Sequence, residues 1–171
     1  MALRNIMTEQ EPALHKVCRP VTSFDEKLHR LLDDMAETLE KAQGAGLAAP
    51  QVGILRRVAL VDTGDEVLEL VNPVLLETDG EQEGPEGCLS VPGKWGMVKR
   101  PYYAKVRAQD RYGDWFEAEG EEIVARCFCH ELEHLDGHLY TERVSHWLTE
   151  EELEALYEDD CDEEFEEESE E

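Results

Sequence analysis

The sequence has no long apolar run. Its first twenty residues contain nothing like the apolar segment of a signal peptide, and no later stretch approaches the roughly twenty apolar residues of a membrane-spanning helix. Cysteine is also scarce, with five residues at irregular spacing. An odd set of this kind is not typical of a disulfide framework and favours thiol or metal chemistry in a reducing compartment. We therefore expect a cytoplasmic protein without membrane contact.

Basic residues are few as well. The 171 residues include 16 Lys and Arg against 42 Asp and Glu, which gives a formal net charge of −26. Fifteen of these acids lie in residues 150–171, which contain no Lys or Arg, but the preceding part is also acidic. A nucleic-acid backbone would be repelled at long range, so we expect no direct nucleic-acid binding. Contact with a basic protein surface is compatible with this charge.

A chain of this length fits one domain, which can bury roughly two-thirds of the surface that the unfolded chain exposes. We predict that this domain covers residues 1–158. Residues 159–171, DDCDEEFEEESEE, are too charged to bury, so we expect a disordered acidic tail that supports solubility. The alternative for the tail is an electrostatic arm that contacts basic ribosomal proteins.

Apolar periodicity predicts the secondary structure. A helix is expected over 23–43, where leucines and a methionine recur at helical spacing, with Ser23 or Asp25 as N-cap and Gly44 at its end. A second helix is expected over 121–137, ending at Gly137, and a short one after Thr149, where a capping-box pattern begins. Strands that pair antiparallel are expected in the intervening segments. These are 56–63, 66–78, 97–113 and 115–120.

The stretch CFCHELEHLDG, 127–137, concentrates potential metal ligands. His130 and His134 are four residues apart and therefore lie on one face of the predicted helix. Glu131 lies about 100° around the helix from His130, so it can flank an ion without binding it. Two imidazoles suit zinc or ferrous iron, and a catalytic ion of this kind usually has a third protein ligand and one open position. The alternative is an ordinary polar helix surface.

Two other segments contain small or reactive residues. GAGLAAPQVG, 44–53, follows the first predicted helix, and its glycines let the backbone run close to a ligand, although a helix C-cap and loop would have the same composition. EGCLSVPG, 86–93, contains Cys88. A lone cysteine is more often a small buried apolar residue than a ligand.

Taken together, three motifs resemble those of the peptide deformylases. The family carries G-x-G-x-A-A-x-Q, E-G-C-x-S and H-E-x-x-H in this order, and the chain has GAGLAAPQ (44–51), EGCLS (86–90) and HELEH (130–134). The resemblance covers roughly residues 10–148. It implies an enzyme that hydrolyses the formyl amide of N-terminal formylmethionine in new polypeptides. With the periodicity it predicts an α+β fold, in which antiparallel sheets surround a central helix carrying HELEH and an amphipathic N-terminal helix and a short C-terminal helix complete the chain.

The resemblance also implies a metal site. Cys88, His130 and His134 would bind one divalent ion, which we expect to be Fe²⁺ in the cell, with Zn²⁺, Ni²⁺ and Co²⁺ as alternatives. Glu131 would transfer the proton of the attacking water. At two positions the chain departs from the commoner family pattern: Cys129 replaces a glutamine and Glu133 an aspartate. Cys129 leaves alternative ligation open, and Glu133 changes the geometry around the ligands.

Substrate contacts follow from the same resemblance. The Gln51 side chain and the Leu89 backbone N–H would stabilise the negative charge that develops on the formyl oxygen. N-formylmethionyl peptides are the expected partners, and a monomer is the expected state. The residues expected to contact the substrate are Ala45, Gly46, Gly87 and Cys127. For Cys127, inert packing in the helix is the alternative, and Trp95 could either contact the peptide or pack.

A metallopeptidase is the main alternative function, because H-E-x-x-H alone would suit one. In the extended motif H-E-x-x-H-x-x-G-x-x-H, Gly137 matches, but Tyr140 stands where the last ligand is required. A downstream carboxylate, Glu152 or Glu154, could instead complete such a site. A third candidate is a non-catalytic binding module of the same fold, against which the complete set of expected catalytic residues argues.

Overall fold

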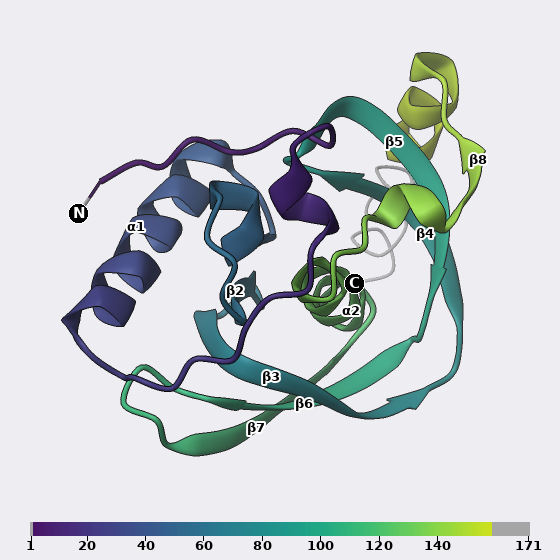
Figure 1. The fold of residues 1–171 in the computed structure, drawn as a ribbon. Helices are drawn as coiled ribbons and strands as arrows, with labels where there is room; N and C mark the ends of the chain where they lie inside the picture. Colours follow the sequence, from purple (N-terminus) through teal and green to yellow (C-terminus); the bar gives the residue numbers. More distant parts are fainter. Residues whose placement is uncertain (1, 159–171) are drawn as a thin grey trace.

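The computed structural model describes residues 2–158, so the predicted tail at 159–171 lies outside the described residues. Mixed helices and antiparallel sheets make up the fold, which confirms the α+β class (Figure 1). The elements in chain order are η1 (Pro12–His15), α1 (Glu26–Ala42), β1 (Gly46–Ala48), η2 (Ala49–Val52), β2 (Val58–Asp62), β3 (Val67–Asp79), β4 (Gln82–Cys88), β5 (Val91–Arg100), β6 (Tyr103–Gln109), β7 (Trp115–Glu121), α2 (Ile123–Leu135), η3 (Tyr140–Glu142) and β8 (Val144–Trp147).

The strands form two sheets in which all neighbours are antiparallel. One has the order β1-β2-β3-β6-β7 and the other the order β4-β5-β8. The prediction of a single strand over 97–113 is wrong. Its first part belongs to β5 in the small sheet and its last part to β6 in the large sheet, with Pro101 between them. Proline lacks a backbone N–H and cannot donate to the ladder, so pairing stops there.

Helix α1 begins where the sequence predicts. The Asp25 carboxylate accepts a hydrogen bond from the N–H of Leu28 at 3.2 Å, so Asp25 is the N-cap. The expected end at Gly44 is off by one residue, because Gln43 takes the left-handed conformation, with φ of 55°. Packing, and not the end of the helix, requires a small residue at position 44. A Cβ at this position would lie 2.8 Å from Cδ1 of Leu89, so this glycine lets the loop pack against the end of β4.

Helix α2 lies between the two sheets and contacts strands of both (Figure 1). Its apolar side chains, including Phe128 and Leu132, pack on the large sheet in one core cluster. The chain leaves the helix at Gly137, where φ is 84° and a Cβ would lie 2.9 Å from the backbone of His15. This packing buries His130, Glu131 and His134, so these three residues of the motif face the protein interior.

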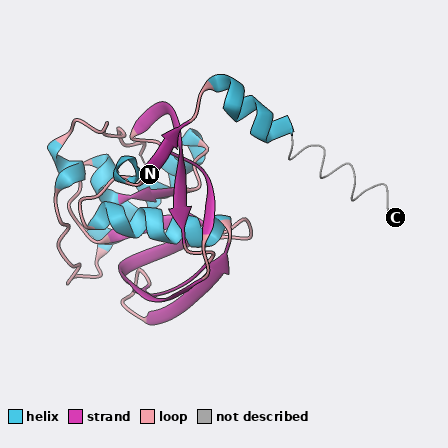
Figure 2. Cartoon of the chain, turned by 90° about the vertical axis from the view of Figure 1, so that its right-hand side faces the viewer, coloured by secondary structure: helices cyan, strands magenta, loops and turns pink. Residues whose placement is uncertain are grey.

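Residues 150–158 are helical and project from the body of the molecule (Figure 2). The capping box predicted for this helix is present: Thr149 Oγ1 accepts from the N–H of Glu152 at 3.2 Å, and the Glu152 carboxylate lies 3.5 Å from the Thr149 N–H. Within the described part of the chain, no helix combines the length and apolar character needed to cross a bilayer.

Candidate metal centre and substrate cavity

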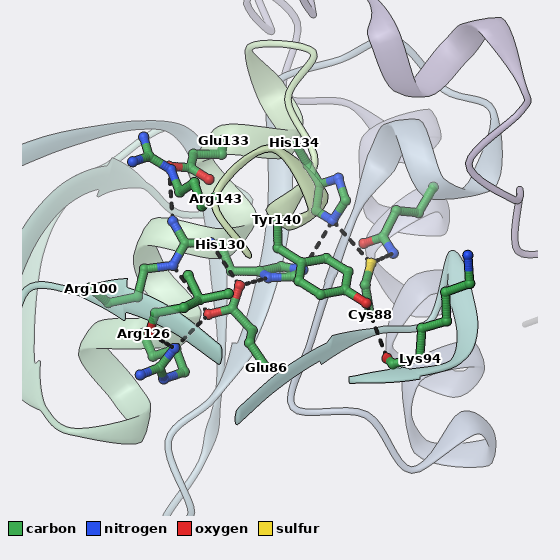
Figure 3. Close-up of polar contacts among 12 residues, drawn as sticks. Glu86, Cys88, Lys94, Arg100, Arg126, His130, Glu133, His134, Tyr140 and Arg143 are labelled. Atoms are coloured by element: carbon green, nitrogen blue, oxygen red, sulfur yellow. Dashed lines mark hydrogen bonds and ion pairs between the residues drawn. The ribbon is translucent and has the colours of Figure 1, made fainter. Parts of the chain in front are cut away.

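Three potential metal ligands converge at the junction of α2 and the small sheet (Figure 3). Cys88 is the last residue of β4, and His130 and His134 lie one turn apart on α2. Nε2 of His134 lies 3.4 Å from Sγ of Cys88 and 3.2 Å from Nε2 of His130. All three ligand atoms lie within 4.8 Å of one another. Segments that are 46 residues apart in sequence therefore present one thiol and two imidazoles to a common point.

The spacing of these atoms fits a small divalent ion. Bonds of about 2.0–2.3 Å in tetrahedral geometry separate neighbouring ligand atoms by about 3.3–3.7 Å. The separations of 3.2 and 3.4 Å are close to that range. His134 is 1% exposed, and burial lowers the pKa of its imidazole well below the ordinary value, so the ring is neutral and can bind a cation. The site thus has the ligand types and the spacing of a catalytic metal centre.

Glu86 orients the first histidine. Its Oε2 lies 2.8 Å from Nδ1 of His130 (Figure 3). Arg100 donates two hydrogen bonds to the same carboxylate, at 2.7 and 3.1 Å, and Arg126 donates a third at 3.0 Å. Burial alone would raise the pKa of Glu86, but the hydrogen bonds from His130 and Arg100 hold it well below its ordinary value. An ionised Glu86 keeps a proton on Nδ1 of His130, so the ring turns Nε2 toward the ligand group.

The network continues to the outer side of α2. Arg100 Nη1 lies 2.8 Å from Glu133, which also pairs with Arg143. Cys129 is buried in the core cluster between α2 and the large sheet. In the part of the chain that the structure describes, the converging ligand group contains Cys88, His130 and His134 but not Cys129. The thiol next to the motif therefore packs in the core.

Glu131 lies against the backbone of the loop that follows α1. A Cβ at Gly46 would fall 2.5 Å from Oε1 of Glu131, so only glycine leaves room for this carboxyl group. Glu131 is 4% exposed, and within residues 2–158 its Oε2 has no hydrogen-bond partner. Burial raises the pKa of Glu131 to about 7. A carboxyl group in this environment can exchange a proton near neutral pH.

Gln51 points its amide toward the ligand group. Its Oε1 accepts a hydrogen bond from the N–H of Ala48 at 2.9 Å, and its Nε2 donates to Ser90 Oγ at 3.1 Å. Nε2 also lies 3.5 Å from Sγ of Cys88. The carbonyl side of the amide is therefore fixed by the backbone, and the NH₂ group faces the site. Leu89 follows Cys88 in the turn between β4 and β5.

A cavity of about 910 Å³ opens beside these residues. Nine of the ten predicted site residues line it, and His134 is the one that does not. The nine are Ala45, Gly46, Gln51, Gly87, Cys88, Leu89, Cys127, His130 and Glu131. Cys127 also packs in the core cluster, and burial raises the pKa of its thiol to about 12, so it presents a neutral, apolar surface.

Sequence reasoning missed the residues that orient the site. Glu86 is the first letter of the E-G-C-x-S motif, so its position two residues before Cys88 was an available signal. Arg100 and Arg126 carry no sequence signal for a role in the site, because single arginines in a strand and a helix are usually exposed. Here the Arg100 side chain is 2% exposed and the Arg126 side chain 11%. Both cations are kept in place by Glu86.

The residues at the positions where a metallopeptidase would need its third metal ligand make other contacts. Tyr140, at the place of the third histidine, donates a hydrogen bond to the carbonyl of Lys94 at 3.0 Å and stacks on the ring of His130. Glu152 caps the helix at 150–158 and lies 2.7 Å from Nε2 of His146. Neither belongs to the converging ligand group of the described residues.

Comparison with known proteins gives consistent matches. A family model described as polypeptide deformylase matches residues 3–150. A peptide deformylase of Agathobacter rectalis is 56% identical over 144 residues, which cover 84% of this chain and 91% of the relative. One of Caldanaerobacter subterraneus is 49% identical over 158 residues, covering 92% and 99%. The crystal structure of the Thermotoga maritima peptide deformylase superposes with a TM-score of 0.81 at 40% identity, covering 84% of this chain and 98% of that one.

Proposed function

Because the chain belongs to the polypeptide deformylase family, we propose that the cavity beside Cys88 is where it removes the formyl group from the N-terminal formylmethionine of new polypeptides. The formyl amide is hydrolysed to formate and a free amine. The observation that supports this site is the convergence of Cys88, His130 and His134 beside the cavity that Glu131 and Gln51 line. The metallopeptidase alternative is wrong, since the relatives that match over most of the chain are peptide deformylases.

Cys88, His130 and His134 would hold the metal ion. A divalent ion with one thiolate and two neutral imidazoles keeps a net positive charge and acidifies the water bound to it. Ligand type alone does not choose among iron, zinc, nickel and cobalt, because availability and geometry decide occupancy. We assign Fe²⁺ as the ion in the cell, and metal analysis of anaerobically purified protein tests this assignment.

Glu131 would carry the proton. It takes a proton from the attacking water and returns it to the amide nitrogen as the C–N bond breaks. The contact with Gly46 keeps the carboxyl group of Glu131 at one place in the cavity. There it lies beside His130 without being one of the metal ligands. A group that accepts and then donates the same proton needs such a fixed position, because each transfer requires hydrogen-bond distance.

Two hydrogen-bond donors would stabilise the developing negative charge. As water attacks the formyl carbon, charge develops on the formyl oxygen. The NH₂ group of Gln51, already aimed at the site by Ala48 and Ser90, and the backbone N–H of Leu89 can donate to that oxygen. Donors that are preorganised need no rearrangement during the reaction, which is why removing one typically lowers turnover by about 10²- to 10³-fold.

The remaining assignments concern the substrate contacts, the oligomeric state and the location of the enzyme in the cell. The small residues Ala45, Gly46 and Gly87 would contact the peptide backbone, and Cys127 would contact the methionine side chain. One chain contributes every group assigned to the site, so we propose that a monomer is active. We place the enzyme in the cytoplasm, where new polypeptides emerge, and the net charge of −26 supports contact with basic ribosomal proteins. Residues 1–158 would form the catalytic domain.

A mass measurement tests the proposed function. The metal-loaded protein is incubated with a formyl-methionyl peptide and, as control, with the same peptide lacking the formyl group. We expect the first to lose the mass of one CO unit, with formate released in equal amount, and the second to stay unchanged. Internal cleavage of either peptide, or no change in both, would overturn the proposal.

A further inference from the structure

We propose that Trp95 is a specificity-determining residue, whose indole contacts the peptide beyond the formylmethionine and favours apolar side chains there. This inference rests on the proposed function, since it concerns the same cavity. The cavity lining includes Trp95, and its side chain is 39% exposed. An exposed tryptophan on a cavity wall offers a large apolar area with a fixed shape.

The indole lies across the residue next to the predicted metal ligand. A Cβ at Gly87 would be 3.0 Å from three ring atoms of Trp95: Cδ2, Cε3 and Cζ3. Three equal distances to atoms of the six-membered ring mean that the ring covers this glycine. Since Gly87 directly precedes Cys88, the indole forms the wall of the cavity one residue away from the ligand group.

The backbone that carries Trp95 is held from both sides. The carbonyl of Trp95 accepts a hydrogen bond from the N–H of Leu148 at 2.8 Å, and the carbonyl of Lys94 accepts one from the Tyr140 hydroxyl at 3.0 Å. Tyr140 in turn stacks on His130, with ring centroids 5.9 Å apart and an interplanar angle of 30°. Figure 3 shows Tyr140 between His130 and Lys94. A preorganised aromatic surface gives up little conformational entropy when a ligand binds.

The burial of the lining residues indicates which part of the substrate meets the indole. The groups assigned to the reaction lie in the buried part of the cavity, where Glu131 is 4% and His130 9% exposed. The formyl group must reach that end, so the rest of the peptide leaves past more exposed residues. Trp95 is one of these, and Ile123 and Tyr102, which are 68% and 37% exposed, also line the cavity. The side chains after methionine therefore meet a rim that carries three large apolar side chains among charged ones, Glu83, Lys94 and Glu122.

The size of the cavity leaves room for these residues. At about 910 Å³ it is near the upper end of the range for pockets that enclose a drug-sized ligand. Formylmethionine alone is smaller than such a ligand. The simplest occupant of the remaining space is the residue or two that follow methionine, and an indole wall favours apolar or aromatic side chains at these positions.

The experiment compares substrates and variants. Steady-state kinetics are measured with formyl-methionine amide, which has nothing after methionine, with formyl-Met-Phe-Phe and with formyl-Met-Ser-Ser. For Trp95→Ala we expect kcat/KM on formyl-Met-Phe-Phe to fall about tenfold, mainly through KM, while the amide substrate stays within about twofold. Trp95→Phe should retain most of the preference for formyl-Met-Phe-Phe over formyl-Met-Ser-Ser. Trp115→Ala is the matched control, because Trp115 is 49% exposed and lies outside the cavity lining.

The outcomes separate the two proposals. Equal loss on all three substrates would show that Trp95 only packs, and unchanged kinetics on all three would show that it does not contact the peptide. Either result overturns the inference and leaves the proposed function intact. If the unmodified enzyme removes formate from none of the three, the proposed function itself fails.

Discussion

Glu86 and His130 are linked by a hydrogen-bond contact of 2.8 Å between the carboxylate Oε2 and the imidazole Nδ1. The other ring nitrogen, Nε2, faces His134 at 3.2 Å. One side of the ring is thus held by a carboxylate and the other side belongs to the ligand group. The carboxylate is itself fixed by Arg100 and Arg126. The orientation of a proposed metal ligand therefore depends on a residue that does not belong to the ligand group.

Replacing this carboxylate should weaken metal binding. Glu86→Gln removes the charge that keeps the proton on Nδ1 of His130, so we expect the affinity for Zn²⁺ or Co²⁺ to fall about 10- to 100-fold. Competition with a chromophoric chelator measures this affinity. Glu83→Gln, an exposed position on the same strand, is the control and should change nothing. Equal affinities for the two variants would contradict the role given to Glu86.

The two thiols near the site should behave differently. Cys88→Ser should weaken or abolish metal binding, because a hydroxyl is a poorer ligand than a thiolate for these ions. Cys129→Ser should leave the metal content unchanged, since this thiol packs in the core cluster. Metal content per chain after dialysis compares them. If only Cys129→Ser loses the metal, the assigned ligand set is wrong.

A single methyl group at Gly46 should disturb catalysis without removing a functional group. In Gly46→Ala the new Cβ would lie 2.5 Å from Oε1 of Glu131, so the carboxyl group must move. We expect formate release to fall at least tenfold while metal content is retained. In the Glu131→Gln background the same change should cost little more, because the proton transfer is already lost. Additive losses in the double variant would argue against the coupling of these residues.

Removing the acidic tail should not affect the chemistry. No residue assigned to the metal, proton transfer or oxyanion lies in 159–171, so deletion of this segment should leave the rate on a short formyl-methionyl peptide within about twofold, or about 0.4 kcal/mol of barrier. A tenfold loss on this peptide would show that the tail supports the site. A loss confined to ribosome-bound chains, and abolished by salt, would instead indicate a docking arm.

Much of the fold was readable from sequence because periodicity and capping are local. Asp25, Thr149 and Gly137 mark element ends by properties of their own side chains or backbone. Strands β1, β4 and β8 and the first half of β5 were missed. The glycines and prolines of 80–96 hide any alternation, and pairing with a distant strand makes this segment extended. Tertiary pairing of this kind leaves no local signal.

The residues of the candidate site also fall into those that the sequence indicates and those that only the fold brings into place. The three short motifs point to Cys88, His130 and Glu131 because the chemistry requires those residue types. The burial of Arg100 could not be predicted, since it depends on carboxylates at Glu86 and Glu133, which lie on two other elements. A charge becomes acceptable in the interior only when its partners are in place, and those partners are set by the fold.

The most direct test of the account is formate release by Glu131→Gln at equal metal content. This variant keeps Cys88, His130 and His134, so we expect one metal ion per chain, as in the unmodified protein. Without the carboxyl group the proton transfer is lost, and formate release should fall by about 10²- to 10⁴-fold. Near-normal formate release at full metal occupancy would contradict the central claim that Glu131 carries the proton in this site.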